Sequence, residues 1–224
     1  MAIFNHISLA ARIATRDLRG GARGLWLLIA GVFVGAAAVA LVGATSQSLI
    51  DGARQCALET IGGDLSLRLY HRPPSEAELT IIHREGDVSI SVELRPMVRA
   101  VRNGRADGMP VLVELKGVDR KYPLYGTVET LPAFNLYQEI DLYDGVYGAV
   151  ADKALFAAME LKLGDSLQIG NATYQLRGVL VAEPDRAFRA FTLGPRIMVL
   201  GESLPATGVT NDGAEVYYYT RVKL

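Results

Sequence analysis

The feature that most constrains this chain is an uncharged, apolar run near its N-terminus. Residues 25–44 read LWLLIAGVFVGAAAVALVGA and contain no acidic or basic side chain. A bilayer core about 30 Å thick is crossed by roughly 20 residues of α-helix. A helix satisfies its own backbone hydrogen bonds in lipid, whereas a single segment cannot close a barrel. The run therefore predicts one transmembrane helix over residues 25–45.

Two other interpretations of the run are weaker. A long helix inside a soluble domain usually keeps a polar face, and this run has none. A cleaved signal peptide would place its small-residue site at Val42-Gly43-Ala44. The run is longer than the usual apolar core of a signal, and it begins far from the first residue. A membrane anchor is therefore the favoured interpretation.

Charges before the run predict how the chain is oriented. Four arginines precede it, against one acidic residue, Asp17; the arginines are Arg12, Arg16, Arg19 and Arg23. Positive flanks stay in the cytoplasm, so residues 1–24 are expected inside and the rest of the chain outside, in the periplasm of a cell with an inner membrane. The apolar residues of this first segment gather on one helical face. That pattern is typical of an amphipathic helix lying on the lipid membrane, and a cytoplasmic partner would suit it equally well.

Small residues mark one side of the predicted membrane helix. Gly31 and Gly35 form a G-x-x-x-G pattern, and Gly43 lies two turns further along. Because glycine lets two helix backbones approach closely in lipid, these positions predict packing against partner membrane helices. Simple exposure to lipid is the alternative.

Residues beyond the run predict a helical stalk and a mixed domain. Residues 46–61 continue without a breaker except Gly52, and Gly62-Gly63 ends the helix. Residues 62–224 alternate between β patterns and short helical ones, which predicts an α+β fold. Strands are expected at 64–70, 88–101, 110–118, 145–150, 197–200 and 216–222, a hairpin at 163–184 around Gly170-Asn171, and helices at 76–84 and 152–161.

Composition and motifs exclude several functions. The net charge of −1 argues against a nucleic-acid binder. Cys56 is the single cysteine, so no internal disulfide forms. The sequence has no phosphate-binding loop, dinucleotide fingerprint, nucleophile elbow or zinc-protease motif. We expect no enzymatic activity, no cofactor and no metal.

Several motifs together resemble a known family. The pattern L-x-x-G-D-x-L-x-I spans residues 161–169 and precedes the Val-Leu-Val run at 179–181, and YPLYG spans residues 122–126. Further matching stretches are LSLRLYHR at 65–72, VELKGVDRKYPLYGTVE at 113–129, GVYGA at 145–149 and FTLGPR at 191–196. With the membrane helix and stalk, these stretches resemble the first part of FtsX-like ABC transporter permeases. The similarity is greatest to the YbbP-like subgroup, which is related to the lipoprotein-releasing permeases and carries a MacB-like periplasmic core domain.

The resemblance implies a non-enzymatic permease subunit that works with a separate cytoplasmic ATPase. Motion of the membrane helices would move the outer domain, which would act on lipids, lipoproteins or other envelope substrates. Residues 46–60 would be the lever. The family has at least three further spans after this domain, so this chain is expected to be a fragment or split subunit that needs those spans or a second permease chain. The alternative is a single-span envelope binding or adaptor protein.

Overall fold

The computed structural model describes residues 2–186, 194–211 and 213–224, with side chains from residue 26 onward. It divides into two compact units, Met1–Gln55 and Cys56–Leu224. The described residues of the first unit are all helical. The second holds the sheet and is the unit with the candidate site.

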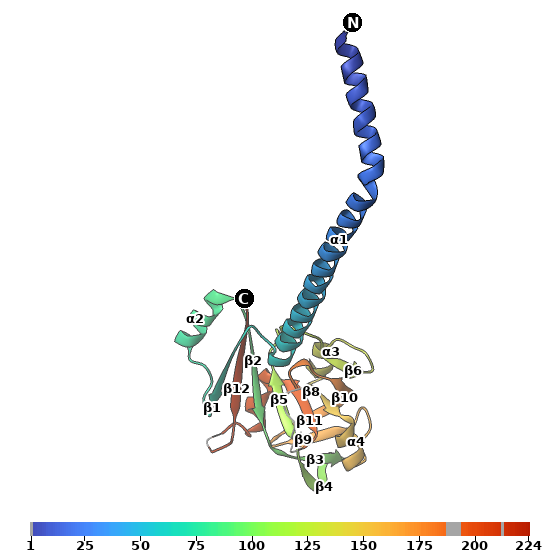
Figure 1. Cartoon of the computed structure of the whole chain (residues 1–224). Coiled ribbons are helices and arrows are strands. Elements are labelled where there is room, and N and C mark those ends of the chain that lie inside the picture. The colour runs from blue at the N-terminus through green and yellow to red at the C-terminus, as the bar shows by residue number, and fades with distance from the viewer. Residues whose placement is uncertain (1, 187–193, 212) are drawn as a thin grey trace. The chain divides into compact units, whose positions relative to one another are not determined.

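One helix, α1, runs from Ala2 to Ile61 without interruption (Figure 1). Its part from Trp26 to Ile61 is long and apolar enough to cross a membrane, by length and composition, and none of its most apolar stretch is buried. The described residues of the expected segments 1–24, 25–45 and 46–61 therefore lie on one continuous helix. Where lipid begins and ends along that helix stays a prediction.

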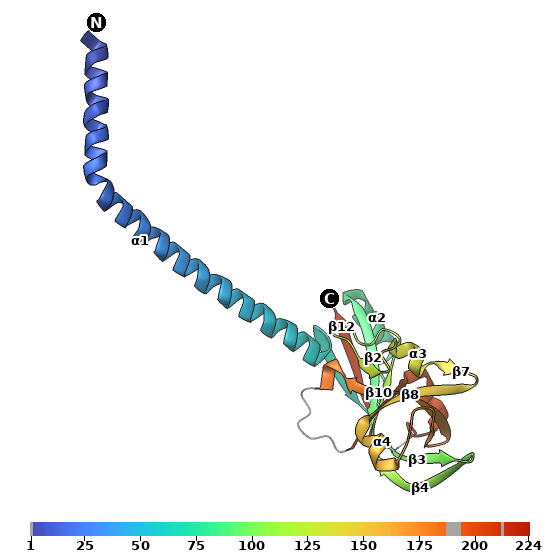
Figure 2. The ribbon, with the colours of Figure 1, turned by 90° about the vertical axis from the view of Figure 1, so that its right-hand side faces the viewer.

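The second unit is built on a twelve-stranded sheet (Figures 1 and 2). The strands are β1 (Leu65–Tyr70), β2 (Asp87–Leu94), β3 (Met97–Arg102), β4 (Arg105–Leu112), β5 (Glu114–Val118), β6 (Glu129–Leu131), β7 (Leu142–Tyr143), β8 (Val146–Asp152), β9 (Ser166–Ile169), β10 (Ala172–Ala182), β11 (Arg196–Leu200) and β12 (Tyr217–Lys223). The helices are α2 (Glu76–Glu85), α3 (Leu136–Ile140), α4 (Lys153–Met159) and α5 (Leu204–Thr207), with short 3-10 turns η1 (Pro184–Arg186) and η2 (Gly201–Ser203).

The sheet is mixed, with the order β1-β12-β2-β5-β11-β8-β10-β9-β3-β4. The pairs β5–β11 and β8–β10 are parallel, and the others along this path are antiparallel. Strands β6 and β7 pair at the side, with β10 and β8. Short helices interleaved with such a sheet confirm the predicted α+β class.

Central strands are buried on both faces. In β11, Ile197 and Val199 pack into the larger apolar cluster, whereas Met198 and Leu200 pack into the smaller one. A strand covered on both faces reads as a continuous apolar run, as IMVL does. Burying each side chain of this size stabilises the fold by about 1.5–3 kcal/mol.

Locally encoded elements match the sequence predictions. The hairpin predicted at 163–184 is β9–β10, and its register closes at Ile169 and Ala172 around the predicted turn. The helix predicted at 76–84 is α2, which begins with a capping box. The Ser75 hydroxyl accepts a hydrogen bond from the Glu78 amide at 3.3 Å, and the Glu78 carboxylate accepts one from the Ser75 amide at 2.7 Å.

Two predicted strands are wrong in extent. The single strand expected at 88–101 is two strands, β2 and β3, broken at Arg95-Pro96. Proline lacks an N–H for the ladder, so the chain leaves β2 there, and β3 pairs far along the sheet with β9 and β4. The strand expected at 110–118 likewise divides, into β4 and β5, at Val113.

Candidate functional site

A buried charge cluster lies where α1 meets the sheet. Its centre is Lys116 on β5. Four side chains surround the centre: Asp185 on η1, Arg221 on β12, Glu183 and Tyr122. The side chains of Lys116 and Glu183 are fully buried, and that of Asp185 is 2% exposed. We call these five residues the joint cluster.

Lys116 is surrounded by acceptors. Its ammonium lies 2.5 Å from Glu183 Oε1 and 2.6 Å from Asp185 Oδ1, and it donates to the Tyr122 hydroxyl at 2.9 Å. The Tyr122 hydroxyl in turn donates to Asp185 Oδ1 at 2.6 Å. Desolvating an ammonium costs several kcal/mol, and charged partners at this distance are what offsets it.

Arg221 connects this cluster to the end of α1. Its Nε donates to the carbonyl oxygen of Ile61 at 3.0 Å, and its second guanidinium nitrogen lies 2.5 Å from Asp185 Oδ2. The remaining nitrogen donates to Ser91 Oγ at 2.6 Å. Ile61 is the last residue of α1, and a helix leaves its final carbonyls without helical partners. Arg221 therefore caps the helix with positive charge, which also suits the negative end of the helix dipole.

Two glycines let the chain turn sharply after the helix. Gly62 has φ +77° and donates to the Leu58 carbonyl at 2.8 Å. A Cβ at Gly62 would lie 2.8 Å from the Arg221 side chain, and one at Gly63 would lie 2.9 Å from the carbonyl oxygen of Leu65. Glycine supplies both the left-handed backbone and the space. The helix thus ends directly against the capping arginine.

The YPLYG motif lies at the same junction. Tyr122 belongs to the joint cluster, and the Tyr125 hydroxyl donates to Asp64 Oδ2 at 2.7 Å. The same aspartate oxygen accepts from the backbone amide of Leu224 at 3.0 Å. Gly126 has φ +74°, and a Cβ there would lie 2.8 Å from the Cβ of Pro184. The motif therefore fixes the two chain segments that flank the joint.

A second group of charges surrounds Arg196 on β11. Its guanidinium nitrogens lie 3.3 Å from Glu183, 3.6 Å from Glu93 and 3.8 Å from Glu114. These contacts are longer than those of Lys116, and Glu183 belongs to both groups. The backbone amide of Arg196 donates to Asp152 Oδ2 at 3.0 Å. The charges of β2, β5, β11 and β12 are thereby connected through the interior of one sheet.

Burial and neighbouring charges shift the pKa of Asp185 in opposite directions, whereas burial and the Asp185 charge shift the pKa of Tyr122 in the same direction. Burial raises the pKa of the Asp185 carboxyl, but the positive charges of Lys116 and Arg221 outweigh it and hold that pKa well below its ordinary value. Burial raises the pKa of the Tyr122 hydroxyl well above its ordinary value, and the Asp185 carboxylate adds to that rise. Asp185 therefore stays ionised and Tyr122 stays protonated at neutral pH.

The joint cluster is a closed network of buried charges. Lys116, Asp185 and Arg221 are buried and bonded to one another, so no substrate reaches them without disrupting the fold. Within the part of the chain that the structure describes, no group of three His, Cys, Asp or Glu residues is placed to hold a metal ion. Separating one partner from such a cluster would leave a buried charge without compensation, which is strongly destabilising. The cluster therefore resists local rearrangement of the segments that it connects.

The site residues predicted from the sequence lie elsewhere. Gly31, Gly35 and Gly43 lie on α1, and a Cβ built at any of them meets no atom within 4 Å. Packing of another helix on them stays a prediction. The four flanking arginines, Arg12, Arg16, Arg19 and Arg23, also lie on α1, in the part whose side chains the structure does not describe.

Sequence reasoning missed the joint cluster. The available signal was a charged residue inside a β run, as with Lys116 in VELKGV and Arg221 in YYYTRVK. Charged residues are almost never fully buried unless paired, so a charge at an inward strand position indicates a buried partner. The sequence does not show which segment supplies that partner.

Comparison with known proteins supports the resemblance given by the motifs. No protein-family model matches the chain. A curated Escherichia coli (strain K12) protein described as an uncharacterized ABC transporter permease, YbbP, is 27% identical over 192 residues. The match covers 86% of this chain and 22% of that protein, so the chain spans about a fifth of its relative's length. The predicted resemblance to part of an ABC transporter permease is confirmed.

Two solved structures are similar to a lesser degree. The periplasmic region of MacB from Actinobacillus actinomycetemcomitans is 10% identical, with 74% of this chain and 78% of that chain covered and a TM-score of 0.41. The extracellular domain of the noncanonic ABC-type transporter YknZ from Gram-positive bacteria is 14% identical, with 70% and 83% covered and a TM-score of 0.41.

Proposed function

We propose that this chain is part of the permease subunit of an ABC-type transporter and is not itself an enzyme. The resemblance to the E. coli permease over 86% of the chain supports this proposal. So does a helix of sufficient length and apolarity to cross a membrane. In this account residues 25–45 lie in the lipid, residues 1–24 in the cytoplasm and the sheet domain outside the cytoplasm. The arginine flank supports that orientation.

The proposed mechanism is transmission of motion from the membrane to the outer domain. A separate cytoplasmic ATPase would move the membrane helices, and α1 would convey the movement through residues 46–61. The observation that carries this proposal is the bond from Arg221 to the Ile61 carbonyl within a buried ionic cluster. A helix end held in this way moves with the sheet. A helix joined to the sheet by a flexible linker would not transmit its movement to the sheet.

The proposed targets are lipids, lipoproteins or other envelope molecules that the outer domain would engage. Partners would be the ATPase and the remaining permease spans, or a second permease chain supplying them. One helix cannot line a pathway or give an ATPase a two-sided grip. Transport is therefore proposed to need partner membrane helices beside this one.

Co-expression tests this proposal. The chain would be produced with the ATPase encoded beside it, with and without the polypeptide encoded downstream, and purified by a tag on the chain. We expect the ATPase to co-purify, and to hydrolyse ATP in the complex, only when the downstream polypeptide is present. Failure to co-purify even then would contradict the permease assignment. ATP-dependent activity from the chain and ATPase alone would contradict the proposed need for partner membrane helices.

A further inference from the structure

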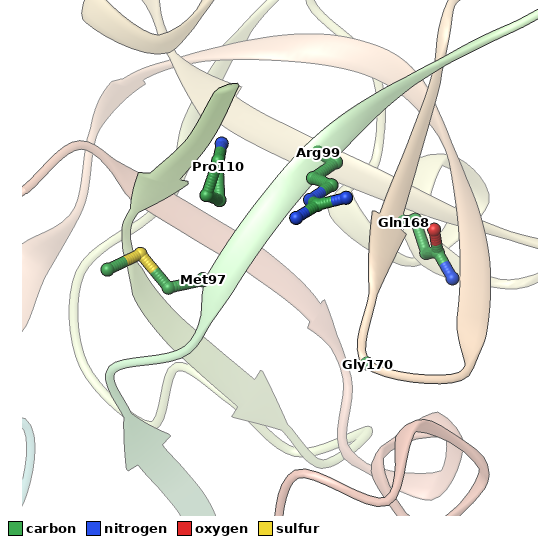
Figure 3. A pocket seen from close by; sticks show the side chains of 5 residues that line it. All are labelled: Met97, Arg99, Pro110, Gln168 and Gly170. Carbon is green, nitrogen blue, oxygen red and sulfur yellow. The ribbon is translucent and has the colours of Figure 1, made fainter. Parts of the chain in front are cut away.

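Strands β3 and β4 lie at the end of the sheet domain opposite the C-terminus in both views (Figures 1 and 2), and a groove lined by residues of β3, β4 and β9 lies there. It consists of two adjoining hollows of about 440 Å³ and 400 Å³, which share Met97 and Gly170. Figure 3 shows the first, where Met97 and Arg99 of β3 face Pro110 of β4 and Gln168 of β9. Hollows of this size hold side chains or a small ligand.

Strand register explains why these side chains face outward. Residues Val98 and Ala100 of β3 point into the core and are 0% and 5% exposed. Because side chains alternate along a strand, Met97 and Arg99 lie on the opposite face. Arg99 is the cross-strand partner of Gln168. Met97 is 57% exposed, and Met109 on β4 is 86% exposed. Exposed methionine is adaptable and is frequent at protein-binding surfaces.

The segment that holds β3 and β4, beside the groove, is basic within an acidic chain. Residues 95–112 hold four arginines and one aspartate, a charge of +3, whereas the whole chain carries −1, which leaves −4 for all other residues. Arg102 pairs with Asp107 at 3.7 Å. Arg95 and Arg99, which line the hollows, form no ion pair with any residue that the structure describes. Glu215 is the acidic residue that lines the second hollow. The charge complementary to this surface is negative.

The edge strand beside the groove, β4, is protected against pairing with a further strand. β4 carries Pro110, which has no N–H, and Gly108 has φ +79°. The β3–β4 register also shifts between Val98 and Ala100. Proline, bulges and charge are the devices that keep an edge strand from adding a further strand. A partner would therefore be recognised through the side chains of the groove.

We propose that this groove binds an acidic, apolar segment of a partner protein. Carboxylates of the segment would pair with the guanidinium groups of Arg95 and Arg99, a geometry that allows two parallel hydrogen bonds. An apolar side chain between them would rest on Met97 and Pro110. The exposed, adaptable side chain of Met97 beside these arginines favours a protein segment over the lipid surface itself. This proposal does not depend on ATPase coupling.

The test uses the full chain in nanodiscs of phosphatidylcholine and a fluorescein-labelled peptide of alternating Glu and Leu. Fluorescence anisotropy reports binding, and a peptide of alternating Lys and Leu is the matched probe. We expect saturable binding of the acidic peptide only. Arg99→Glu is expected to weaken it by at least about tenfold, because reversing one member of a charge pair replaces attraction by repulsion. Met97→Ser is expected to weaken it by roughly threefold, through lost apolar contact.

Arg84→Glu is the control, since Arg84 is exposed in the last turn of α2 and the charge change is identical. We expect it to change affinity by less than about twofold. No binding of the acidic peptide, equal binding of the basic peptide, or equal weakening by Arg84→Glu would overturn the proposal. So would preference for phosphatidylglycerol vesicles that is lost in Arg99→Glu, because the groove would then bind a membrane. A photocrosslink from position 109 to a second copy of this chain would also overturn it, because the groove would then be a self-interface.

Discussion

Arg221 has a different partner on each of its three guanidinium nitrogens. They are the Ile61 carbonyl, Ser91 Oγ and Asp185 Oδ2, which belong to a helix end, a neighbouring strand and a loop. Lysine could not replace it, because a single ammonium does not reach three partners in a plane. The whole connection between α1 and the sheet is therefore sensitive to one side chain.

Replacing Arg221 by Met is expected to loosen the end of α1. The change removes one of the cationic partners of Asp185 and leaves the Ile61 carbonyl without its Arg221 hydrogen bond. The free energy of unfolding is expected to fall by about 3 kcal/mol. Hydrogen exchange of the full chain should show faster exchange at the Gly62 amide, whereas β8 and β10 keep their protection. Arg120→Met is the control, because the Arg120 and Asp141 side chains are about half exposed and such pairs contribute about 1 kcal/mol or less. Unchanged exchange at Gly62 would contradict the role given to Arg221.

Acid is expected to weaken the joint through Asp185. Its folded-state pKa is lower than that of an ordinary aspartate, so its contribution to stability is complete above the ordinary pKa and is lost as pH falls toward the folded-state value. The free energy of unfolding should therefore fall below about pH 4. Asp185→Asn should be less stable than the natural chain at pH 7, and the difference should shrink as pH falls. A constant difference between the two, measured by urea unfolding at several pH values, would contradict this account.

Single elements differ in how far the sequence predicts them. Helix α2 and the β9–β10 hairpin depend on nearby residues, a capping box and a glycine turn, and both were predicted. Pro96 indicated an edge or a bulge in the run 88–101, but the division into β2 and β3 was not predicted, because it depends on which distant strands each half pairs with. The joint cluster was missed for the same reason. Lys116, Glu183 and Arg221 are far apart in the chain, and only the sheet order brings them together.

On α1, the small-residue face is expected to contact other membrane helices. Replacing Gly31 and Gly35 together by Leu should reduce recovery of partner spans in detergent pull-downs, since bulky side chains prevent close backbone approach. The control is Ile29→Leu with Phe33→Leu, two exposed positions spaced in the same way on the opposite face. Equal recovery with the glycine pair replaced would show that this face meets only lipid.

The whole molecule is expected to place its sheet domain outside the cytoplasm. A reporter that is active only outside the cytoplasm, fused after residue 60, should be active, because the arginine-rich end of α1 stays inside. Reversing the four arginines to Glu should reduce that activity. A cytoplasm-only reporter that is active at the same position would contradict the orientation. A mature product beginning near Thr45 would instead indicate a cleaved signal peptide.

We infer that the last turns of α1 and the sheet move as one body. Cys56 is exposed on the helix and is the chain's single cysteine, so a spin label there can be paired with one at Ala158→Cys, an exposed position on α4. Pulsed electron paramagnetic resonance of the complex with its ATPase would then give the distance distribution with and without ATP. We expect one narrow distribution, equal in both states, and a broader one in Arg221→Met. A distribution that is broad in the natural chain, or that shifts with ATP, would show a hinge at the place where we infer a rigid joint.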